Sequence, residues 1–244
     1  MTLIAGIVLP NGILMVSDTR SIYTKNEKPK SDYVRKITFV APNCILGTTG
    51  SDSTFYTARV LRDCLYESKN HLDTETQRKY IIDLFEHVNS IHATNHVNNH
   101  PVGSILIADY NTNQNSYTLF SLRRFIDSSE SIERNDIRAI ELVGASEHIR
   151  QRTKAYIQSV LDNLTDEELN YNRIDEYIAK QCRKIFQEES KLFDGINDKL
   201  YCVYLTTIKD NLPASAVYLI DSDDAIHMLN HQEHDEEIIL PIKN

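Results

Sequence analysis

The chain contains 244 residues, with 35 Asp and Glu against 26 Lys and Arg and a formal net charge of −9. The hydrophobic fraction of 41% with 25% charged residues is typical of globular proteins and excludes a wholly disordered chain. The acidic balance disfavours a general binder of nucleic-acid backbones, which needs a basic face. No apolar run approaches the roughly 18 residues that span a bilayer. We therefore expect neither a nucleic-acid partner nor a membrane partner.

The length suits one large domain or two small ones. No linker, repeat or low-complexity segment divides the chain, so we expect a single domain over residues 1–244 with an acidic C-terminal tail over about 231–244. No basic residue precedes the apolar stretch from Leu3 to Leu9, so we expect no signal peptide and a cytoplasmic protein.

The first half of the chain starts with strand patterns and continues with helix patterns. Pro10-Asn11-Gly12 and Pro42-Asn43 are typical turns, and Ser51 and Asp52 are good helix caps. The predicted strands are Leu3–Leu9, Ile13–Asp18, Lys36–Val40 and Cys44–Thr49, with an exposed loop over Ser21–Asp32. The predicted helices are Ser53–Lys69 and Thr74 to about Asn95, both from apolar residues at helical spacing.

The second half repeats this order. The predicted strands are Ser104–Tyr110, Ser116–Leu122 and Ala139–Val143, then Leu200–Ile208 and Ala216–Ile220 after two helices, Glu147–Asn163 and Ile174 to about Ser190. The predicted order is strands, two helices, strands, two helices and strands. This order does not consist of alternating βαβ units. The order predicts an α+β fold: a four-layer αββα sandwich of two antiparallel sheets flanked by helix pairs.

Four cysteines, Cys44, Cys64, Cys182 and Cys202, are present without a CxxC pair. We expect four buried, inert thiols in a reducing compartment; a cysteine nucleophile is the alternative, without a local signature.

Thr2 follows Met1 directly. Removal of Met1, which a small second residue permits, would give a threonine with a free α-amine. That amine titrates near pH 8 and can act as the base for the hydroxyl of the same residue.

Three charged residues are expected near Thr2. If Leu3–Leu9 and Ile13–Asp18 form a hairpin, Asp18 and Arg20 return to the edge where Thr2 lies. Lys36 opens the next strand at the same edge. An aspartate that holds a lysine beside a hydroxyl would lower the pKa of that hydroxyl; the alternative is a surface ion pair.

Gly47-Thr48-Thr49-Gly50 ends a strand just before a helix. A glycine there lets a backbone N–H approach a ligand and act as an oxyanion donor, although the glycine can equally serve only the turn.

These segments together resemble the start of a proteasome β-type subunit of the N-terminal nucleophile (Ntn) hydrolase superfamily. The similarity lies in Thr2–Val8 with Asn11-Gly12, Val16–Arg20, Arg35–Ile37, Ala41–Asn43 and Gly47–Gly50, and is weaker in Pro101–Ile107 and Val143-Gly144. The resemblance implies the Ntn hydrolase fold, with Thr2 as nucleophile, Asp18 and Lys36 activating it and the Gly50 N–H in the oxyanion hole. The absence of a propeptide before Thr2 resembles the simpler bacterial and archaeal members of the family, such as the Anbu type.

The sequence departs from the family pattern at two places. Ala145 stands where the family has a serine, with Ser146 next, and Lys191 and Asp194 stand where it has an aspartate and a serine. We expect Arg20 to support the site, with Ser146 or Asp194 substituting for the family residues that are missing. The resemblance implies that Ser21, Thr48 and Asp52 line a polar substrate pocket. It also implies self-assembly into a ring or related homo-oligomer, with any unfoldase partner unknown.

Histidines and acidic residues offer weaker metal patterns. His92 and His96 lie four apart, with His87 and His100 nearby, and His227, His231 and His234 lie in or near the acidic tail. Solvated surface is favoured for all of them, and Asp221–Asp224 lacks the spacing of a calcium loop. We expect no metal and no cofactor.

The sequence thus favours a threonine hydrolase that cleaves peptide or other amide bonds after Met1 is removed. The alternatives are a non-catalytic ring or scaffold subunit on the same fold, and a peptide ligase or non-peptide amidase.

Overall fold

The computed structural model describes residues 2–22, 29–67, 72–95, 103–124 and 129–229. Its strands are β1 (Leu3–Leu9), β2 (Gly12–Asp18), β3 (Ser21–Ile22), β4 (Pro29–Ser31), β5 (Ile37–Ala41), β6 (Cys44–Thr48), β7 (Ile105–Asn111), β8 (Ser116–Arg124), β9 (Ser129–Arg134), β10 (Ile140–Gly144), β11 (Leu200–Ile208), β12 (Leu212–Ile220) and β13 (Ile226–Met228). Its helices are α1 (Asp52–Glu67), α2 (Thr74–Asn95), α3 (Glu147–Asp162), α4 (Asp166–Leu169) and α5 (Ile174–Ser190), with a 3-10 turn at Lys209–Asn211.

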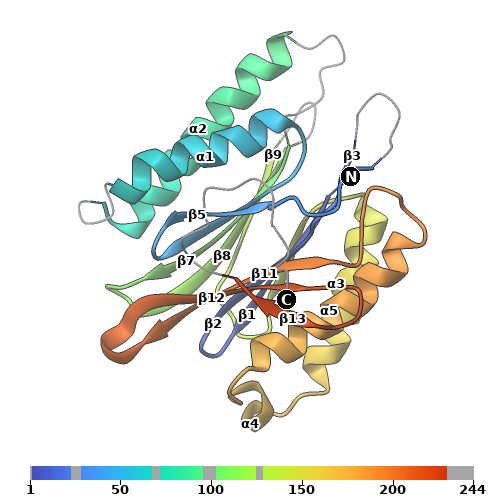
Figure 1. Ribbon diagram of the computed structural model, residues 1–244. Coiled ribbons are helices and arrows are strands. Elements are labelled where there is room, and N and C mark those ends of the chain that lie inside the picture. The colour runs from blue at the N-terminus through green and yellow to red at the C-terminus, as the bar shows by residue number, and fades with distance from the viewer. Residues whose placement is uncertain (1, 23–28, 68–71, 96–102, 125–128, 230–244) are drawn as a thin grey trace.

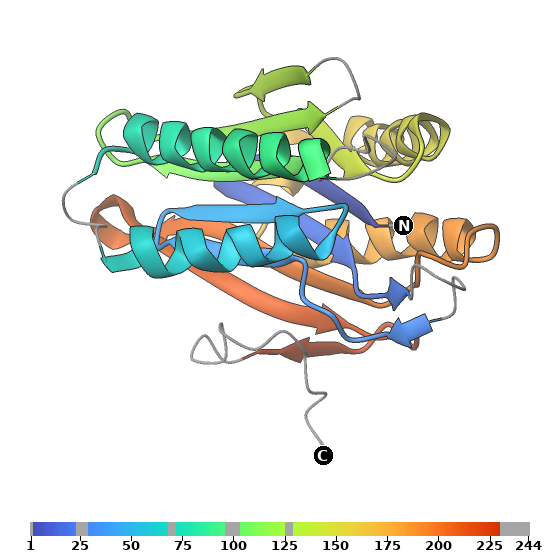
Figure 2. The same cartoon turned by 90° about the horizontal axis from the view of Figure 1, so that it is seen from above.

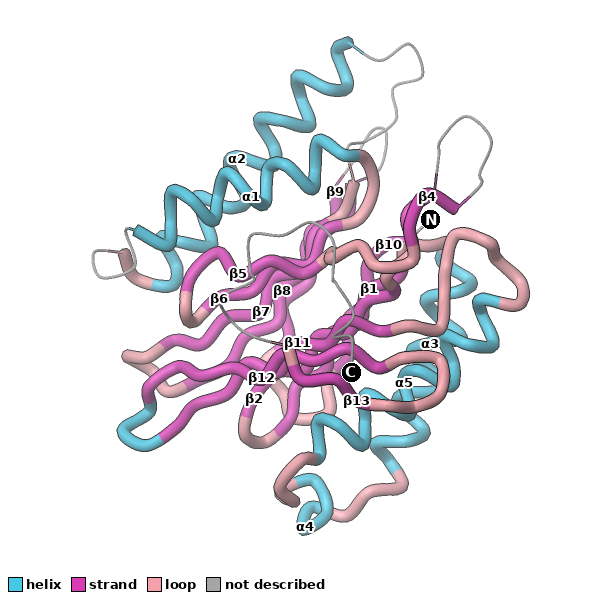
Figure 3. Tube along the Cα trace, in the orientation of Figure 1, coloured by secondary structure: helices cyan, strands magenta, loops and turns pink. Residues whose placement is uncertain are grey.

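These elements form an α+β fold around two main antiparallel sheets (Figure 1, Figure 3). The larger sheet has six strands in the order β10-β1-β2-β11-β12-β13, and the other has five in the order β5-β6-β7-β8-β9. Strands β3 and β4 pair separately. Every pairing between these strands is antiparallel, as expected from hairpin connections.

The hairpin of β1 and β2 lies inside the six-stranded sheet, between β10 and β11, and all residues of both strands are buried. Successive side chains of a strand point to opposite faces, so burial of every residue requires cover on both faces. Leu3 and Ile7 accordingly pack in a cluster with residues of α3 and α5. Ile4 and Val8 pack instead against residues of the five-stranded sheet.

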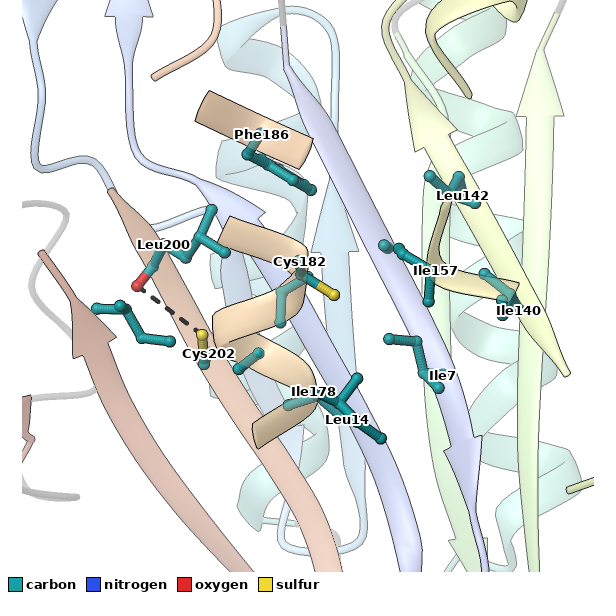
Figure 4. Packing of buried hydrophobic residues seen from close by; sticks show 14 of the residues in the cluster. Ile7, Leu14, Ile140, Leu142, Ile157, Ile178, Cys182, Phe186, Leu200 and Cys202 are labelled. Carbon is teal, nitrogen blue, oxygen red and sulfur yellow. Dashed lines mark hydrogen bonds between the residues drawn. The ribbon is translucent and has the colours of Figure 1, made fainter. Parts of the chain in front are cut away.

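Three clusters of buried side chains hold the elements together. The first joins the six-stranded sheet to α3 and α5, and Figure 4 shows Ile178 of α5 in it beside Leu14. The second contains side chains from both main sheets. The third joins the five-stranded sheet to α1 and α2. Figures 1 and 2 show α1 and α2 together beside β5 and β7, whereas α3 lies beside β10 and α5 beside β2.

Several short or polar elements differ from the sequence-based expectation. The exposed loop expected over Ser21–Asp32 contains the paired strands β3 and β4, with 23–28 outside the described residues. Strand β9 was not predicted because its residues are mostly exposed and polar, so it lacks an apolar pattern. Strand β12 starts four residues earlier than predicted, at Leu212, because pairing with β11 continues along it. Strand β13 and the one-turn helix α4 are too short for periodicity to reveal.

The cysteine prediction is wrong at one position. Cys44, Cys182 and Cys202 are buried, and burial raises the pKa of all three thiols, that of Cys182 to about 12. Cys64 is exposed instead, because it lies on the outer side of α1 whereas Leu61 and Leu65 face the third cluster.

None of the helices in the described ranges is long and apolar enough to cross a bilayer.

Candidate active site

A cavity of about 800 Å³ opens at the edge of the sheets where β1 begins and β6 and β10 end. Segments far apart in the sequence contribute to its wall. Its lining consists of Thr2, Ile22, Thr49, Gly50, Ser104, Arg123, Gly144, Ala145, Ser146, Arg150, Leu192, Phe193, Asp194 and Gly195. Four residues singled out in the sequence, Thr2, Gly50, Ser146 and Asp194, therefore meet at one cavity.

Asp18 and Lys36 form a buried ion pair next to Thr2. The backbone N–H of Leu3 donates to Asp18 Oδ1 at 2.8 Å, and Lys36 Nζ donates to Asp18 Oδ2 at 2.6 Å. The Asp18 side chain is fully buried and that of Lys36 is 8% exposed. The surface ion pair considered from the sequence is therefore excluded.

The hairpin register explains the position of Asp18. Ile4 pairs with Ser17, so Leu3 and Asp18 face each other at the open end of the hairpin. The backbone of Lys36 is held at the end of β6, because the Lys36 carbonyl accepts the Thr48 N–H at 3.0 Å.

The electrostatics of Lys36 combine two opposing effects. Burial lowers the pKa of the Lys36 ammonium, because a charged group loses its hydration there, and the Asp18 carboxylate opposes that shift. The backbone N–H of Arg20 also donates to Asp18 Oδ2, at 3.2 Å. Asp18 thus accepts bonds from two backbone N–H groups and one ammonium.

The backbone of Thr2 is held from the other side by the end of β10. Its carbonyl accepts the Ala145 N–H at 2.7 Å. Gly144 has φ +81°, and a Cβ there would lie 2.1 Å from the Thr2 carbonyl oxygen, so only glycine fits. Ala145 itself has φ +43°, a conformation that side-chain-bearing residues seldom adopt.

The segment that carries Gly50 is bonded to the start of β7. The N–H and hydroxyl of Thr49 both donate to the Ser104 carbonyl, at 3.0 and 3.1 Å. Gly50 has φ +108°, and within the described residues its N–H has no hydrogen-bond partner. An unpaired N–H on the cavity wall can bind a ligand oxygen.

Arg20 supports this edge from outside the cavity. It forms a two-point ion pair with Asp32, at 2.6 and 3.2 Å, and its Nη1 donates to the Asp194 carbonyl at 3.1 Å. Hydrogen bonding from Arg20 lowers the pKa of the Asp32 carboxyl. Arg20 therefore ties the chain after β2 to the loop that follows α5.

The other predicted residues have different positions. The Ser146 hydroxyl accepts the Ile149 N–H at 3.4 Å and so caps α3.

The three residues predicted to line the pocket, Ser21, Thr48 and Asp52, are not among the described residues that line the cavity. Ile22 and Thr49 line it instead. Thr48 is buried within the sheet and Asp52 is exposed at the start of α1. Neighbouring residues of an extended segment point to opposite sides, which explains the offset by one residue.

Two residues of the cavity lining were not predicted from the sequence. Arg123 lies near the end of β8, and Arg150 lies in the first turns of α3. Arg150 is four residues after Ser146, so helical spacing alone would have placed both on one side of the helix.

In the described part of the chain, no group of three or more His, Cys, Asp or Glu residues is arranged to hold a metal ion. His96, His100, His231 and His234 lie outside the described residues, as do Met1, Pro101, Val102 and the acidic tail.

No protein-family model matches the chain, and no curated protein matches it.

Proposed function

We propose that this protein is a threonine-type amide hydrolase related to proteasome β subunits, with Thr2 as its nucleophile. The proposal extends to the fold, a four-layer αββα sandwich of the Ntn hydrolase type. Support comes from the three buried clusters, of which one joins α3 and α5 to the first sheet, one contains residues of both sheets and one joins the second sheet to α1 and α2.

The observation that carries the proposal is the position of Thr2 between a cavity and a buried ion pair. Thr2 lines the cavity, and the next residue, Leu3, donates its N–H to Asp18, which also binds Lys36. The site thus combines a hydroxyl, a buried ammonium and, at Gly50, an unpaired N–H donor. These are the groups that nucleophilic acyl transfer requires.

In the proposed reaction, removal of Met1 gives Thr2 a free α-amine. The Thr2 hydroxyl oxygen attacks the amide carbonyl carbon, and the α-amine accepts the hydroxyl proton. The C–N bond then breaks, the proton passes to the leaving amine, and an ester on Thr2 remains. Water hydrolyses that ester, which releases the carboxylic acid and restores the hydroxyl.

The neighbouring groups have separate roles in this scheme. The Lys36 ammonium lowers the pKa of the Thr2 hydroxyl, and Asp18 orients Lys36 and the backbone beside Thr2. The Gly50 N–H stabilises the oxyanion that forms on the carbonyl oxygen.

The decisive experiment compares Thr2→Ala with Thr2→Ser. Thr2→Ala should lower turnover of peptide reporters by about 10⁴ or more, whereas Thr2→Ser keeps a hydroxyl and should keep measurable turnover. Both should retain the wild-type melting temperature, since Thr2 is only half-buried. Intact mass should show the loss of one methionine in the active chain. Full activity in Thr2→Ala would refute the mechanism.

A second candidate is a non-catalytic scaffold subunit on the same fold. It is favoured by Ala145 at the position of the family's serine and by Ser146, whose hydroxyl caps α3. Lys191 likewise pairs with Glu188 at the surface, at 2.7 Å. A chain that keeps Met1, forms homo-oligomers and turns over no amide substrate would support the scaffold.

A further inference from the structure

Two guanidinium groups line the same cavity as Thr2. Arg123 comes from the end of β8 and Arg150 from α3, so each is held by a different regular element. Asp194 is the one carboxylate among the described residues of the lining. Two of the three charged residues that line the cavity are therefore arginines, although the whole chain is acidic.

The two arginines differ in how their charge is compensated. Arg123 contacts the buried Glu141 closely and pairs with Glu130 at 3.1 Å. Arg150 has no carboxylate within ion-pair distance in the described part of the chain. Its Nη1 donates to the carbonyls of Gly144 and Ala145, at 2.8 Å each.

The unused edge of Arg150 suits a planar anion. Within the described residues its Nε and Nη2 make no hydrogen bond, and these two donors lie side by side as a carboxylate requires. Burial lowers the pKa of Arg150, and the nearby charge of Arg123 acts in the same direction, while Glu147, Glu141 and Glu130 oppose it. A bound anion would offset the cost of keeping this cation partly buried.

We propose that the cavity recognises a carboxylate of the substrate, held by the free Nε and Nη2 donors of Arg150. The inference deepens the proposed function, on which its turnover assay rests.

The carboxylate has two possible sources, an acidic side chain or the free C-terminus of a peptide. Reporter peptides that differ only by Glu or Gln at each position around the scissile bond test the first source. Peptides with a C-terminal acid or amide test the second. In the wild-type protein, kcat/KM should be at least about tenfold higher for one acidic member of these pairs, the size expected for a charge-assisted bond.

Three variants locate that preference. Arg150→Gln should reduce the acid-to-neutral ratio to about one, and Arg150→Lys should retain part of it because it keeps the charge. Lys154→Gln is the matched control, since it removes one positive charge from α3 four residues further on, outside the cavity lining. It should leave the ratio unchanged. Arg150→Gln also loses the hydrogen bonds to the Gly144 and Ala145 carbonyls, which would slow the turnover of acidic and neutral substrates alike. The ratio of kcat/KM between the acidic and the neutral peptide is unaffected by such a general loss and is therefore the quantity to measure.

Binding to the Thr2→Ala variant separates the two proposals. Fluorescence anisotropy with the same labelled peptide pairs should show tighter binding of the acidic member, and this difference should disappear when Arg150→Gln is added. Arg150-dependent binding without turnover in the wild type would support the inference and contradict the hydrolase. Turnover with an acid-to-neutral ratio that Arg150→Gln leaves unchanged would overturn the inference and support the hydrolase.

Discussion

The backbone N–H of Leu3 donates to Asp18 Oδ1 at 2.8 Å, across the open end of the first hairpin. The other oxygen of the same carboxylate accepts Lys36 Nζ. One fully buried side chain thus fixes both the backbone next to Thr2 and the orientation of the lysine. Any change at Asp18 should affect stability and activity together.

The first prediction concerns this ion pair. Asp18→Asn leaves the Lys36 ammonium buried without its counter-charge and should lower the free energy of unfolding by about 3–5 kcal/mol. Lys36→Met should cost less, because Asp18 keeps the N–H groups of Leu3 and Arg20 as donors. The double variant should be more stable than Asp18→Asn alone, as measured by urea unfolding. A double variant with additive losses would contradict the coupling.

The second prediction concerns the pH dependence of turnover. The Thr2 amine must be neutral, so kcat/KM should rise with pH toward about 8. Protonated Lys36 must persist, and burial lowers its pKa, so kcat/KM should fall again at a pH below the ordinary lysine value of about 10.4. In Lys36→Arg the alkaline decline should vanish from the remaining activity, because the guanidinium stays charged. An unchanged alkaline limb in that variant would exclude Lys36 as its source.

The third prediction compares two neighbouring residues. Gly144→Ala adds a Cβ that would lie 2.1 Å from the Thr2 carbonyl oxygen at φ +81°, so it should cost about 2 kcal/mol or more and reduce turnover. Ala145→Gly relieves a residue at φ +43° and should stabilise by about 0.5–1 kcal/mol. Thermal melts check both. A Gly144→Ala variant with wild-type stability and turnover would contradict the close contact with the Thr2 backbone.

The fourth prediction concerns Asp32, whose pKa is lowered chiefly by its hydrogen bonds with Arg20. A lowered carboxyl pKa stabilises the fold above the ordinary value of about 3.9, and this contribution is lost as the pH falls through the folded-state pKa. Asp32→Asn should therefore cost up to about 1 kcal/mol at pH 7, a modest value because the pair is partly exposed. Urea unfolding at pH 7 and at acidic pH should show the difference shrinking. A difference that persists at low pH would point to packing instead of charge.

The amino-acid pattern alone predicted the strands and long helices that carry the site. The Asn11-Gly12 turn and the apolar runs around it predicted the first hairpin, and pairing arithmetic then brought Asp18 to the start of β1. The pairing of Asp18 with the start of β1 was predictable because the register of a two-stranded hairpin depends on local sequence and turn length. Strand β9 was not predictable in this way, because its exposed polar residues pair with β8 without an apolar pattern.

Tertiary structure alone decided what surrounds Thr2. Arg123, Arg150 and the loop after α5 lie far from Thr2 in the sequence, and only the packing of both sheets with α3 brings them to one cavity. The offset from Ser21 and Thr48 to Ile22 and Thr49 likewise depends on which side of an extended segment faces the opening. Local sequence determines the period and the pairing of elements, but the identity of a cavity wall depends on contacts between distant segments that no local pattern records.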